Sequence, residues 1–128
     1  LVCLVDTDDG ALLLHPAVDG FDELLSASFL AQRGRGGDRH VGRKLKALLV
    51  AAVAQAASMR LYPFTSEQVG PRDFLRVTTG FKAGVLGPPY IDPVRLEQIG
   101  DALDDAAEDP GFFGQAMGYA AFARVPSP

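Results

Sequence analysis

The amino-acid sequence predicts a single domain over residues 1–128 of the α+β class. We expect it to be mostly helical, with an N-terminal β-hairpin in a small sheet packed against three or four helices. The length of 128 residues is typical of one domain with its own core. Two short apolar runs near the start flank an Asp-Gly turn, and longer segments after them repeat apolar residues with the period of a helix.

The predicted hairpin joins the apolar runs 1–5 and 11–14. The segment between them ends in Asp9-Gly10, a pair that adopts the positive φ angles of a tight hairpin turn. Neither run alternates with polar residues, which favours strands covered on both faces. We therefore expect Cys3, in the first run, to be buried as a small apolar residue.

Two helices are expected next. The first begins near Phe21, has acidic residues in its first turn, and ends at the glycines that start with Gly34. The second is predicted over 39–61 with Asp38 as its N-cap, and Pro63 ends it. Its apolar stripe consists of Leu45, Leu48, Leu49, Ala52, Ala56 and Met59.

The next segment has weaker signals. Thr65 and Gln68 form a capping box that predicts a short helix, which Gly70-Pro71 ends. The β-branched residues of segment 73–81 favour a strand there.

The C-terminal third starts with a clear helix. Asp92 as N-cap and Pro93 at the first helical position predict a helix that ends at 109–111. Segment 112–125 fits either a helix weakened by two glycines or a strand.

Composition limits the function. The net charge is −4, which disfavours binding to nucleic acid or anionic membranes, and the longest apolar stretch is too short to cross a bilayer. One cysteine excludes an intramolecular disulfide and a cysteine-built zinc site. We expect no cofactor and no metal. The first residues lack the basic region of a signal peptide, so we expect a soluble, cytoplasmic protein, with a composition typical of GC-rich bacterial genomes.

Residues 33–46, called here the basic segment, hold six of the twelve lysines and arginines. Its basic residues are Arg33, Arg35, Arg39, Arg43, Lys44 and Lys46. With Asp38 the segment carries +5, which leaves −9 on the other 114 residues. Cations at the start of a helix oppose its dipole by roughly 0.3–1 kcal/mol each, so we expect a negative group opposite them.

Three candidates for that negative group remain open. The acidic segment 92–109 can neutralise the cations within the chain, unless they simply lie in solvent. A protein with an acidic surface, or a second copy of the chain, can pair with them. A phosphate-bearing ligand or nucleic acid is the third, although the segment lacks aromatic residues that RNA-binding segments use.

We expect a non-catalytic protein-binding domain of adaptor, accessory or immunity type that uses the basic segment. The only two histidines, His15 and His40, are far apart and have no nucleophile pattern beside them. The sequence therefore favours binding over catalysis.

An alternative comes from the segment LVDTDDGALL, which resembles the first motif of the haloacid-dehalogenase-like phosphatases. The resemblance implies a Mg²⁺-dependent phosphohydrolase with Asp6 as nucleophile and Asp8 as acid/base. It also implies a phosphate-binding Thr78 or Thr79 followed by Lys82, and metal ligands at Asp101 and Asp105. The chain departs from the family at Asp9, which is inserted before the glycine, and at segment 94–105, which has the period of a helix. The sequence therefore assigns no family.

Overall fold

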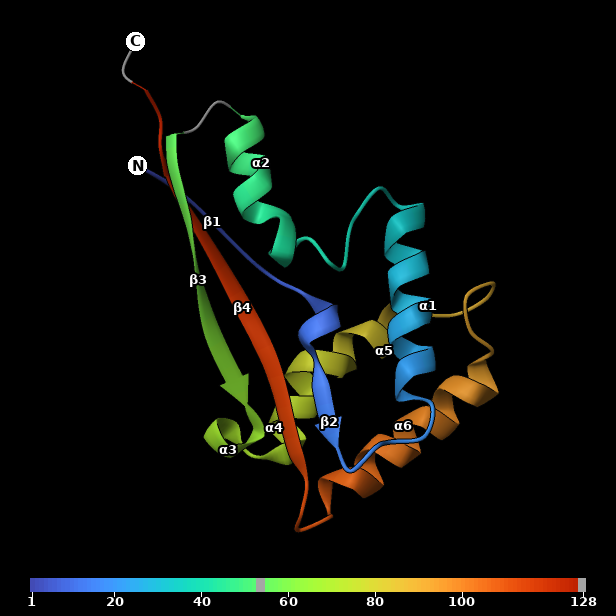
Figure 1. Ribbon diagram of the computed structural model, residues 1–128. Helices are drawn as coiled ribbons and strands as arrows, with labels where there is room; N and C mark the ends of the chain where they lie inside the picture. Colours follow the sequence, from blue (N-terminus) through green and yellow to red (C-terminus); the bar gives the residue numbers. More distant parts are fainter. Residues whose placement is uncertain (53–54, 127–128) are drawn as a thin grey trace.

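The computed structural model describes residues 1–52 and 55–126 (Figure 1). One antiparallel sheet runs through the described part of the chain, with β4 (Phe113–Arg124) at its centre. On one side β4 pairs along its length with β3 (Gln55–Thr65). On the other side β1 (Val2–Thr7) pairs with residues 118–123 of β4, and β2 (Leu13–His15) pairs with residues 113–115.

Helices make up 49% of the described residues and strands 26%, which confirms the α+β class. The α-helices in the described residues are α1 (Phe21–Gly34), α2 (Leu45–Ala51), α3 (Ser66–Val69), α4 (Pro71–Leu75), α5 (Phe81–Val85) and α6 (Pro93–Ala107). Two 3₁₀ turns, η1 (Asp9–Ala11) and η2 (Gly42–Lys44), and a π-helix, η3 (Arg76–Gly80), complete the described helical structure. No helix in residues 1–52 and 55–126 is long and apolar enough to span a membrane.

Two hydrophobic clusters cover opposite faces of β4. Side chains alternate between the faces of a strand, so Ala116 and Ala121 point to different sides. Ala116 packs against the larger cluster, which includes Leu24, Phe74 and Ile99 from the helices. Ala121 belongs to a smaller cluster beneath α2, with Leu49 among its members. In Figure 1, α2 lies beside one end of the sheet, and the other helices gather around the opposite end.

The two predicted N-terminal strands are present, but they do not form a hairpin with each other. Both pair with β4 instead. Asp8 is the N-cap of η1, and its carboxylate accepts a hydrogen bond from the amide of Gly10. The chain between the two strands is therefore a 3₁₀ turn rather than a two-residue turn, which leaves β1 and β2 end to end along one edge of β4.

The prediction of a buried Cys3 is wrong, because its side chain is exposed. Val2 and Leu4 are half-buried against the cluster under α2, and the alternation of the strand turns Cys3 and Val5 to the other face.

The predicted helix over 39–61 is also wrong in its second half. The helix starts only at Leu45, after η2, and ends at Ala51, and residues 55–65 form β3. Ala57 and Met59 pack beneath α2 while Ser58 and Arg60 are exposed, so this part has the period of a strand. Pairing with β4 outweighs the helical preference of its alanines.

The opposite error occurs at segment 73–81, predicted as a strand, which forms α4 and η3. The hydroxyls of Thr78 and Thr79 donate to the carbonyls of Phe74 and Leu75 at 2.8 and 2.7 Å, so these β-branched residues are satisfied inside a helix. The capping box at Thr65 and the Asp92 cap of α6 are present as predicted.

Candidate functional site

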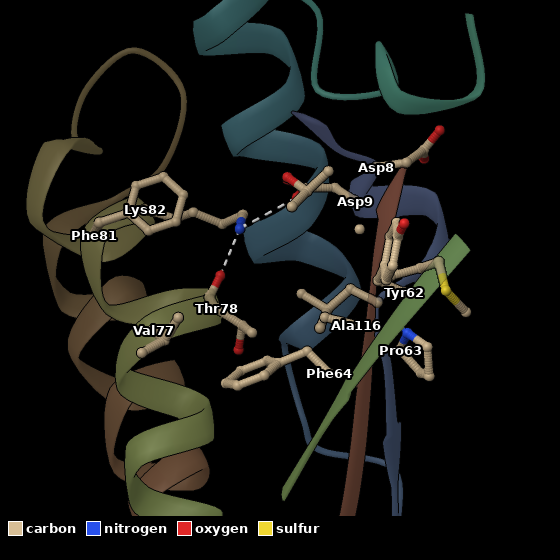
Figure 2. A pocket seen from close by; sticks show the side chains of 14 residues that line it. Asp8, Asp9, Tyr62, Pro63, Phe64, Val77, Thr78, Phe81, Lys82 and Ala116 are labelled. Atoms are coloured by element: carbon tan, nitrogen blue, oxygen red, sulfur yellow. Dashed lines mark hydrogen bonds and ion pairs between the residues drawn. The ribbon is translucent and has the colours of Figure 1, made fainter. Parts of the chain in front are cut away.

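A partly open cavity of about 390 Å³ lies between the helical segment 77–82 and the sheet (Figure 2). Tyr62 and Phe64 of β3 stand directly opposite Gly118 and Ala116 of β4 in the strand register, so all four lie on one face. The two residues on β4 are small and leave space next to the two large rings. Farther along the same face, the ring of Phe74 covers Gly114.

The opposite wall comes from η3 and the start of α5. Val77 and Phe81 line the cavity from this side, each about half exposed. The hydroxyls of Thr78 and Thr79 bond back to carbonyls four residues earlier, a pattern that competes with the regular α-helical hydrogen bonds. Isolated π-turns of this kind are frequent at functional sites.

Lys82 and Asp9 form the polar end of the cavity. Lys82 Nζ lies 3.3 Å from Asp9 Oδ1, and the two side chains are only 3% and 11% exposed. Lys82 Nζ also donates to the carbonyl oxygen of Thr78 at 2.5 Å. Figure 2 shows the lysine side chain extending from the helix toward the aspartate. The site is thus an apolar cavity with one buried ion pair at its end.

The interactions within the Lys82–Asp9 pair do not fully offset the burial of the two charges. Burial lowers the pKa of Lys82 below its ordinary value, and the charge of Asp9 offsets only part of this effect. Asp9 Oδ2 is buried and has no hydrogen-bond partner within the described chain. The Phe81 ring centroid lies 4.5 Å from Lys82 Nζ and 5.0 Å from the guanidinium carbon of Arg39. A cationic nitrogen and an unpaired carboxylate oxygen are therefore held close to an apolar space.

Asp8, the neighbour of Asp9, binds the basic segment. Its carboxylate is buried and accepts hydrogen bonds from Arg43 Nε at 2.6 Å, Arg43 Nη2 at 2.7 Å and the Gly10 amide at 2.8 Å. Burial alone raises the pKa of Asp8, but the hydrogen bonds from Arg43 and Gly10 outweigh burial and hold that pKa below its ordinary value. At Gly42 an added Cβ atom would lie 2.7 Å from both the Thr7 carbonyl oxygen and the Tyr119 ring, so glycine permits this close approach.

The structure does not bring the six predicted site residues together as one free surface. Arg43 is bound to Asp8, and Lys44 pairs with Asp38 at 2.5 Å. Arg39 lies against the Phe81 ring, and its carbonyl oxygen accepts the amide of Asp9 at 2.9 Å. The other three, Arg33, Arg35 and Lys46, are exposed and have no ion pair among the described residues.

The intrachain partners of the basic segment are Asp8 and Asp38, and not the acidic segment 92–109. Ion pairs of that segment involve Arg95, which contacts Asp19 and Glu23, and Glu108, which contacts Arg72. In the described part of the chain, the segment thus forms its ion pairs with Asp19, with α1 and with α4.

The residues implied by the phosphatase resemblance do not form its site. Asp8 is occupied by Arg43, Asp101 is exposed on α6, and the threonine hydroxyls bond to helix carbonyls. Within residues 1–52 and 55–126, no three histidine, cysteine or acidic side chains form a group able to hold a metal ion. Asp8, Thr78 and Lys82 line the cavity, whereas Asp6 and Asp101 are not among its lining residues.

Sequence reasoning missed the pairing of Lys82 with Asp9. The two residues are 73 positions apart, and η1 and α5 bring them together. The one available signal is that Lys82 is the only lysine outside the basic segment and stands in an apolar neighbourhood, next to Phe81 and Ala83. No protein-family model matches this chain, and no curated protein matches its sequence.

Proposed function

We propose that this domain binds a small, mainly apolar molecule with a neutral polar end in the cavity beside Lys82 and Asp9. The observation that carries the proposal is the buried ion pair at the end of a mainly apolar cavity of about 390 Å³. Concave apolar sites with a few polar groups and titratable side chains are the usual form of small-molecule sites, at roughly 300–1,000 Å³.

The opposite charges of Lys82 and Asp9 favour a ligand whose polar group is uncharged. Lys82 and Asp9 compensate each other, so a charged ligand group would bring an unpaired charge next to two side chains that are almost fully buried. A carbonyl or hydroxyl oxygen can accept a hydrogen bond from the ammonium without this cost. The apolar body of the ligand would then lie between Phe64 and Tyr62 on one side and Val77 on the other.

The energetics of buried ion pairs support the same proposal. Replacing such a pair by apolar residues is often neutral or stabilising, because the desolvation cost equals or exceeds the attraction. The pair is therefore an inefficient way to hold this fold together. A role in binding explains why a lysine and an aspartate occupy the end of the cavity.

The test is a fluorescence titration with the neutral apolar dye N-phenyl-1-naphthylamine. We expect saturable binding to the natural protein and a dissociation constant roughly tenfold higher for Gly118→Leu, a change of about 1.4 kcal/mol. A Cβ at Gly118 meets Tyr62 atoms only at 3.5 and 3.8 Å, so the backbone accepts the substitution while the leucine fills the cavity.

Gly100→Leu is the matched control. An added Cβ at Gly100 meets no atom within 4 Å, and this residue lies on α6 away from the cavity lining. Its affinity for the dye should stay within about twofold of the natural protein. Absence of saturable binding, or equal binding by the two variants, would contradict the proposal.

A second candidate is the protein-binding role predicted from the basic segment, now limited to Arg33, Arg35 and Lys46. These cations are exposed, and they lack ion pairs in the described chain. Val50 lies one turn after Lys46 on α2 and is 56% exposed. A cation such as Lys46 beside an exposed apolar side chain suits an acidic protein surface better than a nucleic acid, and the acidic helix α6 of a second copy is such a surface.

Sedimentation velocity at low and high salt tests this second candidate. Charge reversal at Arg33, Arg35 and Lys46 to glutamate should abolish any salt-sensitive self-association. Reversal at Asp101, Asp104 and Asp105 to lysine should restore association when the two variants are mixed. A natural protein that is monomeric at low salt, or a mixture that does not associate, would contradict pairing between copies.

We place either activity in a reducing compartment such as the cytoplasm. Cys3 is free and exposed, and unpaired exposed thiols persist where glutathione and thioredoxin keep them reduced.

A further inference from the structure

We propose that Lys82 is a carbonyl-reactive amine and that the cavity accepts a small apolar aldehyde, which forms an imine with Lys82 Nζ. This inference rests on the proposed function, because it names the ligand class of the same cavity. It adds a covalent step, which a binding site for inert apolar molecules does not have.

The position of the amine carries the argument. Lys82 Nζ is almost fully shielded from bulk water, yet its side chain lines a partly open cavity whose other walls are mainly apolar. Two acceptors, the Thr78 carbonyl oxygen and Asp9 Oδ1, lie at 2.5 and 3.3 Å from Nζ. An ammonium has three protons, so one remains for a ligand oxygen within the described surroundings. An aldehyde oxygen fits this place without adding charge.

The surroundings also favour the neutral, nucleophilic form of the amine. Burial lowers the pKa of Lys82, and desolvated lysines in apolar pockets are the ones that form imines with carbonyl compounds. Lys44 and Lys46, the other two lysines, are exposed on η2 and α2. If solvent access alone set the reaction rate, Lys44 and Lys46 would react with an aldehyde faster than Lys82. Faster reaction of Lys82 would therefore show that the cavity, and not exposure, controls reactivity.

The step balances with the residues present. The Lys82 ammonium transfers one proton to the Asp9 carboxylate, and the neutral nitrogen attacks the aldehyde carbon. A second nitrogen proton moves to the former carbonyl oxygen, which gives a carbinolamine. Asp9 then returns its proton as the carbon–oxygen bond breaks and water leaves. The product is a protonated imine beside the Asp9 carboxylate, so the charge of the site is unchanged and no oxidant or reductant is needed.

Reductive trapping tests the inference. The full chain is incubated with 3-phenylpropanal and cyanoborohydride at neutral pH, and peptide mass spectrometry measures the phenylpropyl group on each lysine. Lys82 should be labelled about tenfold faster than Lys44 and Lys46, since the cavity raises the local aldehyde concentration. Gly118→Leu should remove this preference while labelling of Lys44 and Lys46 stays unchanged, and Gly100→Leu should behave like the natural protein.

Labelling that follows exposure, with Lys44 and Lys46 modified and Lys82 not, would overturn the inference. The dye titration keeps this failure separate from failure of the proposed function. If the dye binds with the expected dependence on Gly118 but Lys82 is not preferred, the cavity is a binding site and the covalent step is refuted. If neither the dye nor the label depends on Gly118, both proposals are refuted.

Discussion

Arg43 ties the basic segment to the beginning of the chain. Its side chain donates two hydrogen bonds to the buried Asp8 carboxylate, although that side chain is 52% exposed. Arg43→Met leaves a buried carboxylate with only backbone donors, which should lower the free energy of unfolding by about 2 kcal/mol. Arg35→Met, in the same segment but with no pairing carboxylate in the described residues, should change it by less than about 0.5 kcal/mol. Urea unfolding at neutral pH measures both.

The same pair predicts a pH dependence. The pKa of Asp8 is held below its ordinary value in the folded protein, so the unfolded chain binds this proton more readily. The stabilisation is therefore complete above the unfolded pKa of about 3.9 and is lost as the pH falls through the lower folded value. Asp8→Asn should reduce the loss of stability below about pH 4. If its acid unfolding curve has the same shape as that of the natural protein, Asp8 is not responsible.

Lys82 and Asp9 call for a double-mutant cycle. Lys82→Met or Asp9→Asn alone leaves one buried charge unpaired and should cost about 3 kcal/mol. The double variant removes both charges and should cost less than about 1.5 kcal/mol, which gives a clear coupling free energy. Chemical denaturation of the four proteins at pH 7 measures it. Additive losses would mean that each residue contributes separately to the fold.

At the scale of elements, packing against β4 requires glycine at one position of the strand and not at another. Gly114 lies under the Phe74 ring, and a Cβ there would come within 2.3 Å of a ring atom. Gly114→Ala should therefore destabilise the protein by about 3 kcal/mol, because the buried ring has to shift. Gly118→Ala, four residues along the same strand, should be within about 0.5 kcal/mol of the natural protein. Thermal unfolding compares the two, and equal effects would disprove the close packing at Gly114.

Helices whose ends are marked by capping residues could be predicted from the sequence. Strands that form because they pair with a distant strand could not. Asp92 and Pro93 fix the start of α6 by local hydrogen bonding and geometry. In segment 55–61 the alanines prefer a helix, but β4 offers partners for the backbone and a cluster for Met59. Such pairing depends on residues about 60 positions away, which periodicity within the segment does not report.

At the scale of the molecule, acidic residues near the turn between β1 and β2 offset part of the positive charge of the basic segment. The sequence predicted a negative group opposite these cations and left three candidates open, with the acidic segment 92–109 as one of them. Asp8 pairs with Arg43, and Asp6, Asp9, Asp38 and Arg39 line one small cavity. The acidic turn stands next to the basic segment because η2 packs against β1, a contact for which Gly42 is needed.

The division into two clusters on opposite faces of the sheet predicts two levels of stability. The cluster under α2 is small and rests on Leu45, Leu49, Ala121 and Ala123, while the larger cluster joins α1, α4 and α6 to β4. A helix of seven residues has little stability of its own, so α2 should open without the rest of the domain. Native-state hydrogen exchange should therefore give lower opening free energies for α2 than for α1 and β4.

Two variants that create a cavity, one in each hydrophobic cluster, test whether the two clusters differ in opening free energy. Leu49→Ala should lower the protection of α2 amides by about 2–3 kcal/mol and leave α1 amides nearly unchanged, because the larger cluster remains intact. Phe74→Ala removes a fully buried ring that packs against β4, so protection should fall in α1, β4 and α2 together. If Leu49→Ala instead reduces the protection of α1 as strongly as that of α2, the domain unfolds as one unit and the sheet transmits the loss from one face to the other.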